Sequence, residues 1–355
     1  LTSIYIYLLK KSLKIKINIE IIGFALMLLF GSIASCINAV DKSSAIQYII
    51  IYTLLFIFLW ENEILNDIII IDENTAVSFF AMISLILGIG FFITHRMTAV
   101  WSLSRMAIFY NLKNGIASNT LAGVMAPFVC GCVLILIESK DIKSKMLSFL
   151  AVMMMLPVLL AIQSRGAYLG MSIAVLWILF RGRSTRIICA FICLFFVVLL
   201  IFINRPELYI RFFGRFSSVV YRTGSSLNGR EKLYKIAWEM FQEHPFIGNG
   251  FWQFYAKGIA EKDPHNFLLA YLASTGIVGC TGFLLYLVVT YKRWINSLKM
   301  KMDNSKLLCE IGITASIIFI VHGFVEPSLS TQAPLSIFIL LALLPVKIKK
   351  EKCYD

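Results

Sequence analysis

The fold of this chain is decided by runs such as residues 267–290, which read FLLAYLASTGIVGCTGFLLYLVVT. This run contains no Asp, Glu, Lys or Arg, and it exceeds the roughly 20 apolar residues that a helix needs to cross a bilayer. Only helices and closed barrels satisfy the backbone inside lipid, and barrel strands would alternate polar and apolar residues. A continuous run of this length therefore predicts a membrane-spanning helix.

The same pattern recurs along all 355 residues. The chain is 59% hydrophobic and 15% charged, with a mean hydropathy of +0.81, whereas a soluble domain is about half apolar and about a quarter charged. We expect an all-α, polytopic membrane protein in which residues 1–355 form a single integral membrane domain. Ten spans are predicted, at approximately 20–40, 45–60, 76–94, 119–138, 146–163, 167–180, 187–204, 267–290, 307–325 and 329–346.

The basic residues divide the connections between these spans into two sides. One side receives 19 of the 33 basic residues, and the positive-inside rule makes it cytoplasmic, with both ends of the chain inside. The net charge of +13 is explained in this way and does not indicate nucleic-acid binding. The chain opens on Leu1 without a signal peptide, and Ile4 to Leu9 are typical of the tail of a span that began earlier, so we expect a truncated start.

The other side receives a polar stretch, residues 205–266, that interrupts the apolar pattern. It holds 9 of the remaining 14 basic residues. Long loops cross the membrane regardless of their charge, so the predicted topology stands and this stretch is an outward-facing loop. Its positive charge indicates an anionic ligand.

One amphipathic helix is predicted inside this loop. Apolar residues recur at helical spacing at Leu233, Ile236, Ala237, Met240 and Phe241. Asn228 is the predicted N-cap, with Glu231 three residues later, and Pro245 ends the helix after His244. Arg230 would then lie in the first turn, where the helix dipole and free N–H groups favour a phosphate. The alternative is a solvated charge.

Three further residues are candidates for the outward-facing site. His265 precedes a span and can act as a general base near neutral pH, with Asn266 capping the span; the alternative is an interfacial histidine without a role. Arg165, in the short connection between two spans, is costly near membrane depth unless it is paired or functional. Glu326, in the turn before the last span, can pair with an arginine or orient a hydroxyl; the alternative is that it lies in a simple surface turn.

Other basic residues are candidate substrate contacts. Arg211 and Arg215 are four residues apart, share a helical face and can hold phosphates. Arg105 lies among Trp101, Phe109 and Tyr110, which can line a groove for a sugar or polar lipid, although Trp101 itself is more typical of an interfacial anchor.

The sequence predicts no metal and no other cofactor. The residues His95, His244 and His322 lack the spacing of metal ligands. Most cysteines lie inside apolar runs and are predicted to be small buried hydrophobes. The segment Gly248-Asn249-Gly250 lacks the third glycine of a dinucleotide-binding loop and is predicted to be a tight turn.

These motifs together resemble the bacterial O-antigen ligase family and the related O-antigen polymerases. The resemblance extends over roughly residues 95–340. It is carried by Ser164-Arg165-Gly166, Gly229-Arg230, the stretch from His244 to Gly250, Pro264-His265-Asn266, Gly276-Ile277-Val278-Gly279, the stretch from Ala117 to Ala122, and Glu326. Such ligases are similar in fold to other polytopic inverting glycosyltransferases and usually have about twelve spans, which fits a missing N-terminal segment here.

The resemblance implies a reaction at the periplasmic face of the bacterial inner membrane. An O-antigen glycan would move from an undecaprenyl diphosphate donor to a sugar of the lipid A core, in lipopolysaccharide biosynthesis. Arg165 and Arg230 would hold the diphosphate, which guanidinium groups can neutralise without a metal. His265 would take the proton from the acceptor hydroxyl or orient it, and residues 205–266 would be the periplasmic loop that carries the catalytic motifs.

Other functions remain open at this stage. An O-antigen or exopolysaccharide polymerase would use the same lipid-linked donor with a lipid-linked acceptor. A transporter of polyprenyl-linked sugars would show repeated halves and charges at mid-membrane, whereas the charges here gather at one outer surface. A non-catalytic membrane scaffold would not explain the positive charge of the loop.

Overall fold

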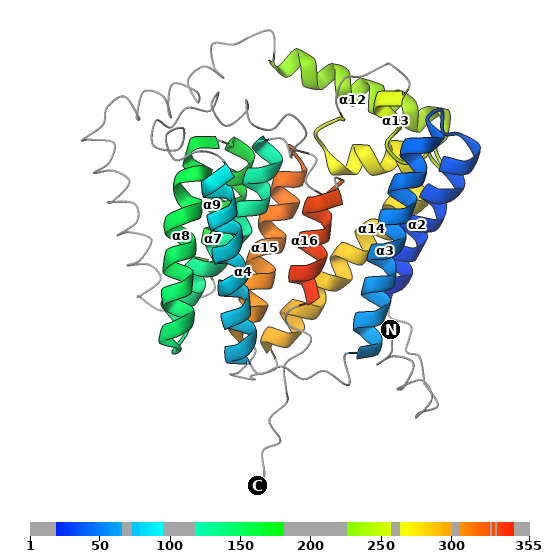
Figure 1. Ribbon diagram of the computed structural model, residues 1–355. Helices are drawn as coiled ribbons and strands as arrows, with labels where there is room; N and C mark the ends of the chain where they lie inside the picture. Colours follow the sequence, from blue (N-terminus) through cyan, green and yellow to red (C-terminus); the bar gives the residue numbers. More distant parts are fainter. Residues whose placement is uncertain are drawn as a thin grey trace.

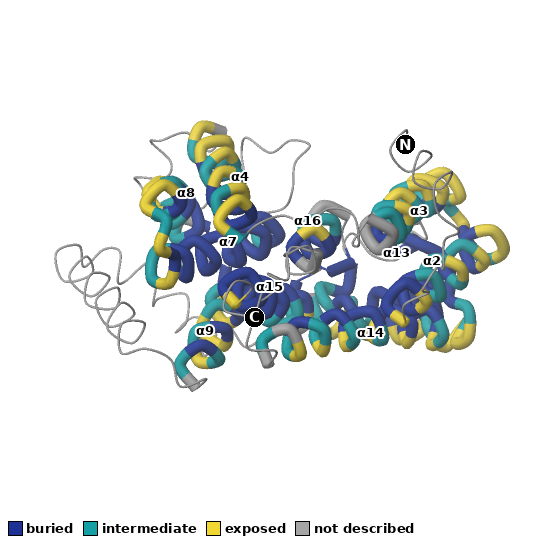
Figure 2. Tube along the Cα trace, turned by 90° about the horizontal axis from the view of Figure 1, so that it is seen from below, coloured by how far each residue is buried: buried dark blue, intermediate teal, exposed yellow. Residues whose placement is uncertain are grey.

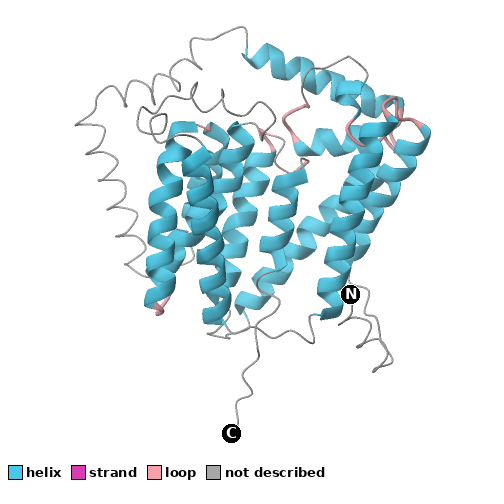
Figure 3. Cartoon of the chain, in the orientation of Figure 1, coloured by secondary structure: helices cyan, strands magenta, loops and turns pink. Residues whose placement is uncertain are grey.

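The computed structural model describes residues 19–65, 73–94, 118–162, 164–180, 226–256, 263–299, 306–326, 329–330 and 332–343. These residues form helices joined by turns, with no strand among them. Most of the helices run side by side as a bundle, and one long helix and one short helix lie across one end of it (Figures 1 and 3).

Seven of the described helices are long and apolar enough to cross a membrane. They are α2 (Ile19–Ile37), α3 (Lys42–Leu65), α4 (Glu73–Thr94), α7 (Ser118–Glu138), α8 (Ile142–Ile162), α14 (Phe267–Lys299) and α15 (Lys306–Gly323). Two shorter helices, α9 (Arg165–Phe180) and α16 (Gln332–Leu343), lie at two further predicted spans. The predicted span 187–204 lies outside the described residues. The prediction of a polytopic helical membrane protein is confirmed.

The spans differ in how much of their surface they bury. Among the described spans, α7 and α15 are the most enclosed, and Figure 2 shows them surrounded by other helices. In contrast, α3, α4 and α8 carry exposed apolar side chains on their outer faces, such as Ile50, Ile86 and Met153. This distribution fits a bundle whose outer helices face lipid tails, which are as apolar as the side chains themselves.

Two glycines allow α2 and α14 to cross closely. A Cβ atom at Gly23 would lie 2.6 Å from the carbonyl oxygen of Gly282, and one at Gly282 would lie 2.6 Å from that of Gly23. Small residues at such crossings let helix backbones approach inside a membrane. The contact fixes α14, which begins two residues after the candidate base His265.

The helix α14 is broken at Gly276, which has φ 64° and ψ −171°. The loop that follows α12 (Ser226–Glu243) binds the broken turn: the N–H of Asn249 donates to the carbonyl of Ala273 at 2.9 Å, and that of Ile277 donates to the carbonyl of Pro245 at 2.8 Å. The loop itself turns through Gly248 and Gly250, both at positive φ. The predicted tight turn is confirmed, and its partner is the break in α14.

The amphipathic helix predicted in the polar loop is present as α12, and the four-residue helix α13 (Gln253–Ala256) follows it. Ile236, Ala237 and Met240 of α12 form a small buried cluster with Phe254 and Ala273. The predicted end before Pro245 is right, but the predicted start is wrong. The helix begins at Ser226 instead of after Asn228, because neither Ser226 nor Leu227 opposes helical geometry. Arg230 therefore lies beyond the free N–H groups of the first turn.

The α12 end of the bundle, where α12 and α13 lie, also receives the turn between α8 and α9 (Figure 3). The turn between α7 and α8, at residues 139–141, lies at the opposite end. Arg165 and the loop helix therefore share one end, as predicted from the alternation of spans.

Candidate active site

The centre of the site is Glu326, in the turn that ends α15. Its backbone N–H donates to the carbonyl of His322 at 2.8 Å, and the N–H of Val325 donates to the same carbonyl at 3.1 Å. These bonds continue the helical pattern for one more turn. The Glu326 carboxylate is thereby held at the α12 end of the bundle, where it is buried, with 5% of the residue exposed.

Three side chains from three other segments donate to this carboxylate. Oε1 accepts from Arg230 Nη2 of α12 at 3.1 Å and from Asn119 Nδ2 of α7 at 2.7 Å. Oε2 lies 3.0 Å from Nδ1 of His265, which precedes α14. These three contacts stabilise the ionised form of the carboxylate, because hydrogen bonds to an ionised group are about twice as strong as neutral ones. Of the alternatives considered for Glu326, the structure shows the pairing with an arginine.

The partners of Glu326 set its charge. Burial acts to raise the pKa of the carboxyl, but the hydrogen bond and charge of His265 and the charge of Arg230 outweigh burial and hold the pKa below its usual value. Glu326 is therefore an anion at neutral pH and acts as an acceptor only. It holds the imidazole and the guanidinium in place and carries no proton to donate.

The backbone around His265 orients the imidazole. His265 has φ 49°, which a non-glycine residue rarely adopts. The next residue, Asn266, accepts the N–H groups of Leu268 at 3.0 Å and Leu269 at 3.2 Å, so it caps α14 as predicted. Its side-chain amide also donates to the carbonyl of Phe324 at 3.3 Å. The cap thus ties the start of α14 to the turn that carries Glu326.

The turn that holds Arg165 lies beside this site. A Cβ atom at Gly166 would lie 2.6 Å from Cγ2 of Val325 and 3.0 Å from Cδ2 of His322, so this turn touches the end of α15. Arg165 itself is exposed, and among the described residues no carboxylate forms an ion pair with it. The turn that carries Arg165 therefore lies close to the Glu326 cluster.

Two neighbours of Glu326 were not predicted as site residues. Asn119 stood in a motif of the resemblance, but its bond to Glu326 joins residues 207 positions apart, a pairing that one sequence does not reveal. Asp263 is buried close enough to His265 and Glu326 for their charges to affect it. Its position two residues before His265 was the only signal available.

The remaining predicted contacts cannot be placed. Arg105, Arg211 and Arg215 lie outside the described residues, so their roles stay predictions. Among the described residues, no group of three or more His, Cys, Asp or Glu side chains is arranged to hold a metal ion.

Comparison with known families shows one match. Residues 150–287 match the family model described as O-antigen ligase. Over this segment the chain is similar to the O-antigen ligase family. No curated protein matches it closely enough to be compared.

The segment shared with the O-antigen ligase family runs from the middle of α8 into α14. It contains Arg165, Arg230 and His265, whereas Asn119 and Glu326 lie outside it. The structure brings residues from outside this segment onto its histidine and one of its arginines, so the site is assembled from more of the chain than the match covers.

Proposed function

We propose that this protein is a glycosyltransferase that moves a glycan from undecaprenyl diphosphate to a sugar of the lipid A core. The observation that carries the proposal is one buried carboxylate, Glu326, bound to both His265 and Arg230 in a chain similar to the O-antigen ligase family. A histidine held by a carboxylate next to an arginine supplies a base and an anion-binding group in one place.

In this proposal His265 acts as the general base. Its Nδ1 donates to Glu326, which selects the tautomer with a lone pair on Nε2. Nε2 takes the proton of an acceptor hydroxyl as the hydroxyl oxygen attacks the anomeric carbon of the donor sugar. Glu326 is the positioning residue, because it holds the ring and stabilises the imidazolium that forms.

Arg230 and Arg165 act on the leaving group. The bond between the anomeric carbon and the diphosphate oxygen breaks as the new bond forms on the opposite face, which inverts the sugar. The diphosphate leaves with the electron pair and needs its negative charge neutralised. Arg230 uses one terminal nitrogen for Glu326 and has further N–H donors, and the exposed Arg165 lies beside the same turn.

The proposal also assigns the α12 end to the periplasm. The family and the apolar helices support a multi-pass membrane protein with lipid-linked sugar substrates. The undecaprenyl donor, the lipid A-core acceptor and the inner membrane are part of the proposal. So is the description of residues 205–266 as a periplasmic loop of a single membrane domain.

The test is restoration of lipopolysaccharide in a bacterial strain that lacks its own ligase. His265→Ala, Arg230→Ala and Arg165→Ala are each expected to reduce attached O-antigen by about 10²-fold or more, the size of a general-base or charge-stabilising contribution. The matched controls are His244→Ala, directly after the end of α12, and Lys235→Ala, on the exposed face of α12. Full-length O-antigen with normally expressed His265→Ala would show that this residue is not the base.

The gel pattern in a deletion strain separates the ligase from the polymerase. Loss of a ligase leaves polymer that is not attached to the core, whereas loss of a polymerase leaves single attached units. A pattern of single units would replace the proposed acceptor with a lipid-linked one and leave the roles of His265 and Arg230 unchanged.

A further inference from the structure

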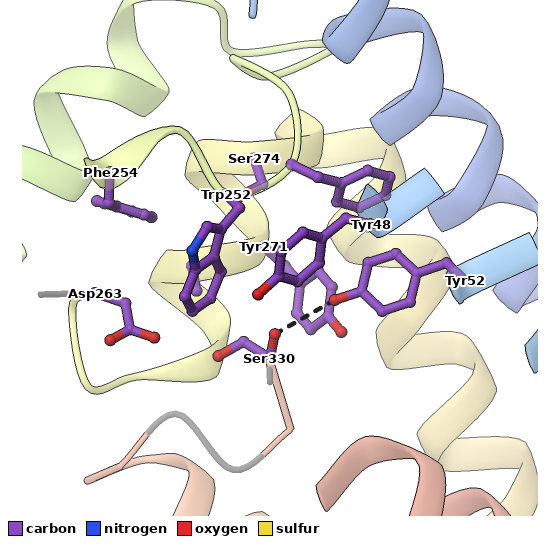
Figure 4. Close-up of a pocket in the computed structure, with 10 residues that line it drawn as sticks. Tyr48, Tyr52, Trp252, Phe254, Asp263, Tyr271, Ser274 and Ser330 are labelled. Carbon is purple, nitrogen blue, oxygen red and sulfur yellow. Dashed lines mark hydrogen bonds between the residues drawn. The ribbon is translucent and has the colours of Figure 1, made fainter. Parts of the chain in front are cut away.

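An aromatic pocket lies beside the Glu326 cluster and has no role in the chemistry proposed above. The space between its lining side chains is a shallow hollow that opens to solvent. Tyr48 and Trp252 are stacked on one side, with ring centroids 4.9 Å apart and an interplanar angle of 15°. Tyr52, Tyr271, Ser330 and Asp263 line the remainder (Figure 4).

Asp263 is the only acidic residue among those that line this pocket. It is 5% exposed, and its Oδ2 has no hydrogen-bond partner among the described residues. Figure 4 shows its carboxyl group next to the Trp252 ring and facing the side of Ser330. A buried polar atom without a partner costs free energy until a ligand or water supplies a hydrogen bond.

The aromatic wall is held in an unfavourable conformation. Trp252 has φ 60°, a region that bulky residues seldom occupy, and such strain is concentrated at ligand clamps and active sites. The next residue, Gln253, fixes it: its Oε1 accepts from the N–H of Val40 at 2.8 Å and of Asp41 at 3.0 Å. The wall is therefore built in advance of any ligand.

Hydrogen bonds also fix the opposite wall of the pocket, which lies close to the proposed catalytic groups. The Tyr271 hydroxyl donates to the carbonyl of Leu329 at 2.9 Å, and the Tyr52 hydroxyl donates to that of Ser330 at 3.3 Å. Ser330 follows Glu326 by four residues, and Asp263 precedes His265 by two. A ligand in the pocket would therefore lie next to the proposed reaction centre.

We propose that this pocket is a subsite for a pyranose ring of the donor glycan or the acceptor, next to the sugar that reacts. Because Tyr48 covers one face of Trp252, the other face of Trp252 would lie against the C–H face of the sugar ring. Asp263, which lies on that side of Trp252 (Figure 4), would accept hydrogen bonds from the sugar hydroxyl groups. The negative charge of Asp263 and the aromatic lining disfavour a diphosphate, which we assign to Arg165 and Arg230. This inference rests on the proposed function for the identity of the glycan. The residues of the subsite take no part in the proposed transfer reaction itself.

Saturation-transfer NMR tests the subsite without requiring turnover. Purified protein in lipid nanodiscs would be titrated with methyl glucoside, methyl galactoside, methyl rhamnoside and methyl N-acetylglucosaminide. We expect saturable binding of at least one pyranoside. Asp263→Asn and Trp252→Leu should each weaken it about tenfold, the order expected for losing one charge-assisted hydrogen bond or one stacking contact.

Matched variants control for general damage. Asp141→Asn makes the same change at the opposite end of the bundle, where Asp141 caps α8 and asparagine caps equally well. Trp238→Leu removes an exposed tryptophan on α12 and is compared with Trp252→Leu. His265→Ala should keep pyranoside binding, because it removes the base and leaves the pocket intact.

The outcomes separate this inference from the proposed function. Pyranoside binding that is absent, or equal in Asp263→Asn, Trp252→Leu and wild type, overturns the subsite even if the protein attaches O-antigen in cells. Binding of tetramethylammonium in place of the sugars would also overturn it, since an aromatic pocket with a carboxylate can hold a cation. Sugar binding without transfer in cells would instead overturn the proposed reaction.

Discussion

At the scale of single residues, one carboxylate organises the site. Glu326 alone contacts Asn119, Arg230 and His265, which come from three segments of the chain. Its own burial would favour the neutral acid, and the surrounding donors reverse that preference. The histidine and the arginine are held in place by the same anion, so a change at Glu326 should affect both.

Replacing Glu326 with Gln should destabilise the protein in a pH-dependent way. The folded-state pKa of Glu326 is lowered, so its stabilising contribution is complete above its ordinary pKa of about 4.3 and is lost as the pH falls through the lower folded value. At pH 7 we expect a loss of about 1–3 kcal/mol, because the charge-assisted bonds are weakened. Thermal unfolding in detergent at several pH values measures the difference between the two proteins. An equal difference at pH 7 and in strong acid would contradict this account.

Replacing Asp263 with Asn should have the opposite effect on stability. Burial raises the pKa of the Asp263 carboxyl, only partly offset by the charge of His265. A raised folded-state pKa means that stability is lost as the pH rises from the unfolded value of about 3.9 through the folded value. An asparagine side chain has no charge to desolvate, so the thermal midpoint of Asp263→Asn should match wild type in acid and exceed it near neutral pH. A lower midpoint near neutral pH would indicate that the carboxylate is a structural partner.

At the scale of elements, the break in α14 explains why the segment from His244 to Gly250 has its composition. Gly248, Gly250 and Gly276 all adopt positive φ, and the loop bonds the backbone of the broken turn. The Asn249 side chain donates to the carbonyls of Met240 and Ala273, which joins the end of α12 to α14. The orientation of α12, and with it that of Arg230, depends on this joint.

Gly276→Ala should disrupt this joint. A Cβ atom at Gly276 would lie 2.3 Å from the carbonyl oxygen of Phe246. The backbone region at φ 64° and ψ −171° is also essentially restricted to glycine and costs another residue on the order of 1–3 kcal/mol even without the clash. We expect a lower thermal unfolding midpoint and faster hydrogen exchange in α12. Gly90→Ala is the control, because nothing lies within 4 Å of a Cβ there and alanine favours a helix by about 1 kcal/mol. Equal midpoints for the two variants would argue against the joint.

Local patterns predicted the elements better than the site. Apolar runs with at most one charged residue located nine of the ten expected spans as helices, and Pro245 marked the end of α12. The start of α12 was missed because capping preferences at Asn228 compete weakly with extension of the helix by two residues. His265, Arg230 and Glu326 were all identified as candidates, yet their contact through one carboxylate depends on how α12, α14 and α15 pack. That packing is set by close approaches such as Gly23 on Gly282, which the sequence pattern of a single helix does not reveal.

At the scale of the whole molecule, the connections that the basic residues assign to one side of the membrane lie at one end of the bundle. The turn at residues 139–141 and the α12 end lie at opposite ends of the bundle (Figures 1 and 3). Lys140 lies in that turn, and Lys143 and Lys145 follow it. The positive-inside rule predicts that this end faces the cytoplasm. Glu326, Arg230 and His265 would then face the periplasm, where a lipid-linked glycan would have to be presented to them.

Cysteine labelling in whole cells tests this orientation. Lys235 is an exposed residue of α12, and Lys143 is an exposed residue of the first turn of α8 at the opposite end. In a background without the native cysteines, Lys235→Cys should react with a membrane-impermeant thiol reagent added outside cells whose outer membrane is permeable. Lys143→Cys should react only after the inner membrane is opened, because the bilayer blocks the reagent until then. The reverse labelling pattern would place Glu326 and His265 on the cytoplasmic side and would contradict the proposed periplasmic reaction while leaving the helical fold unchanged.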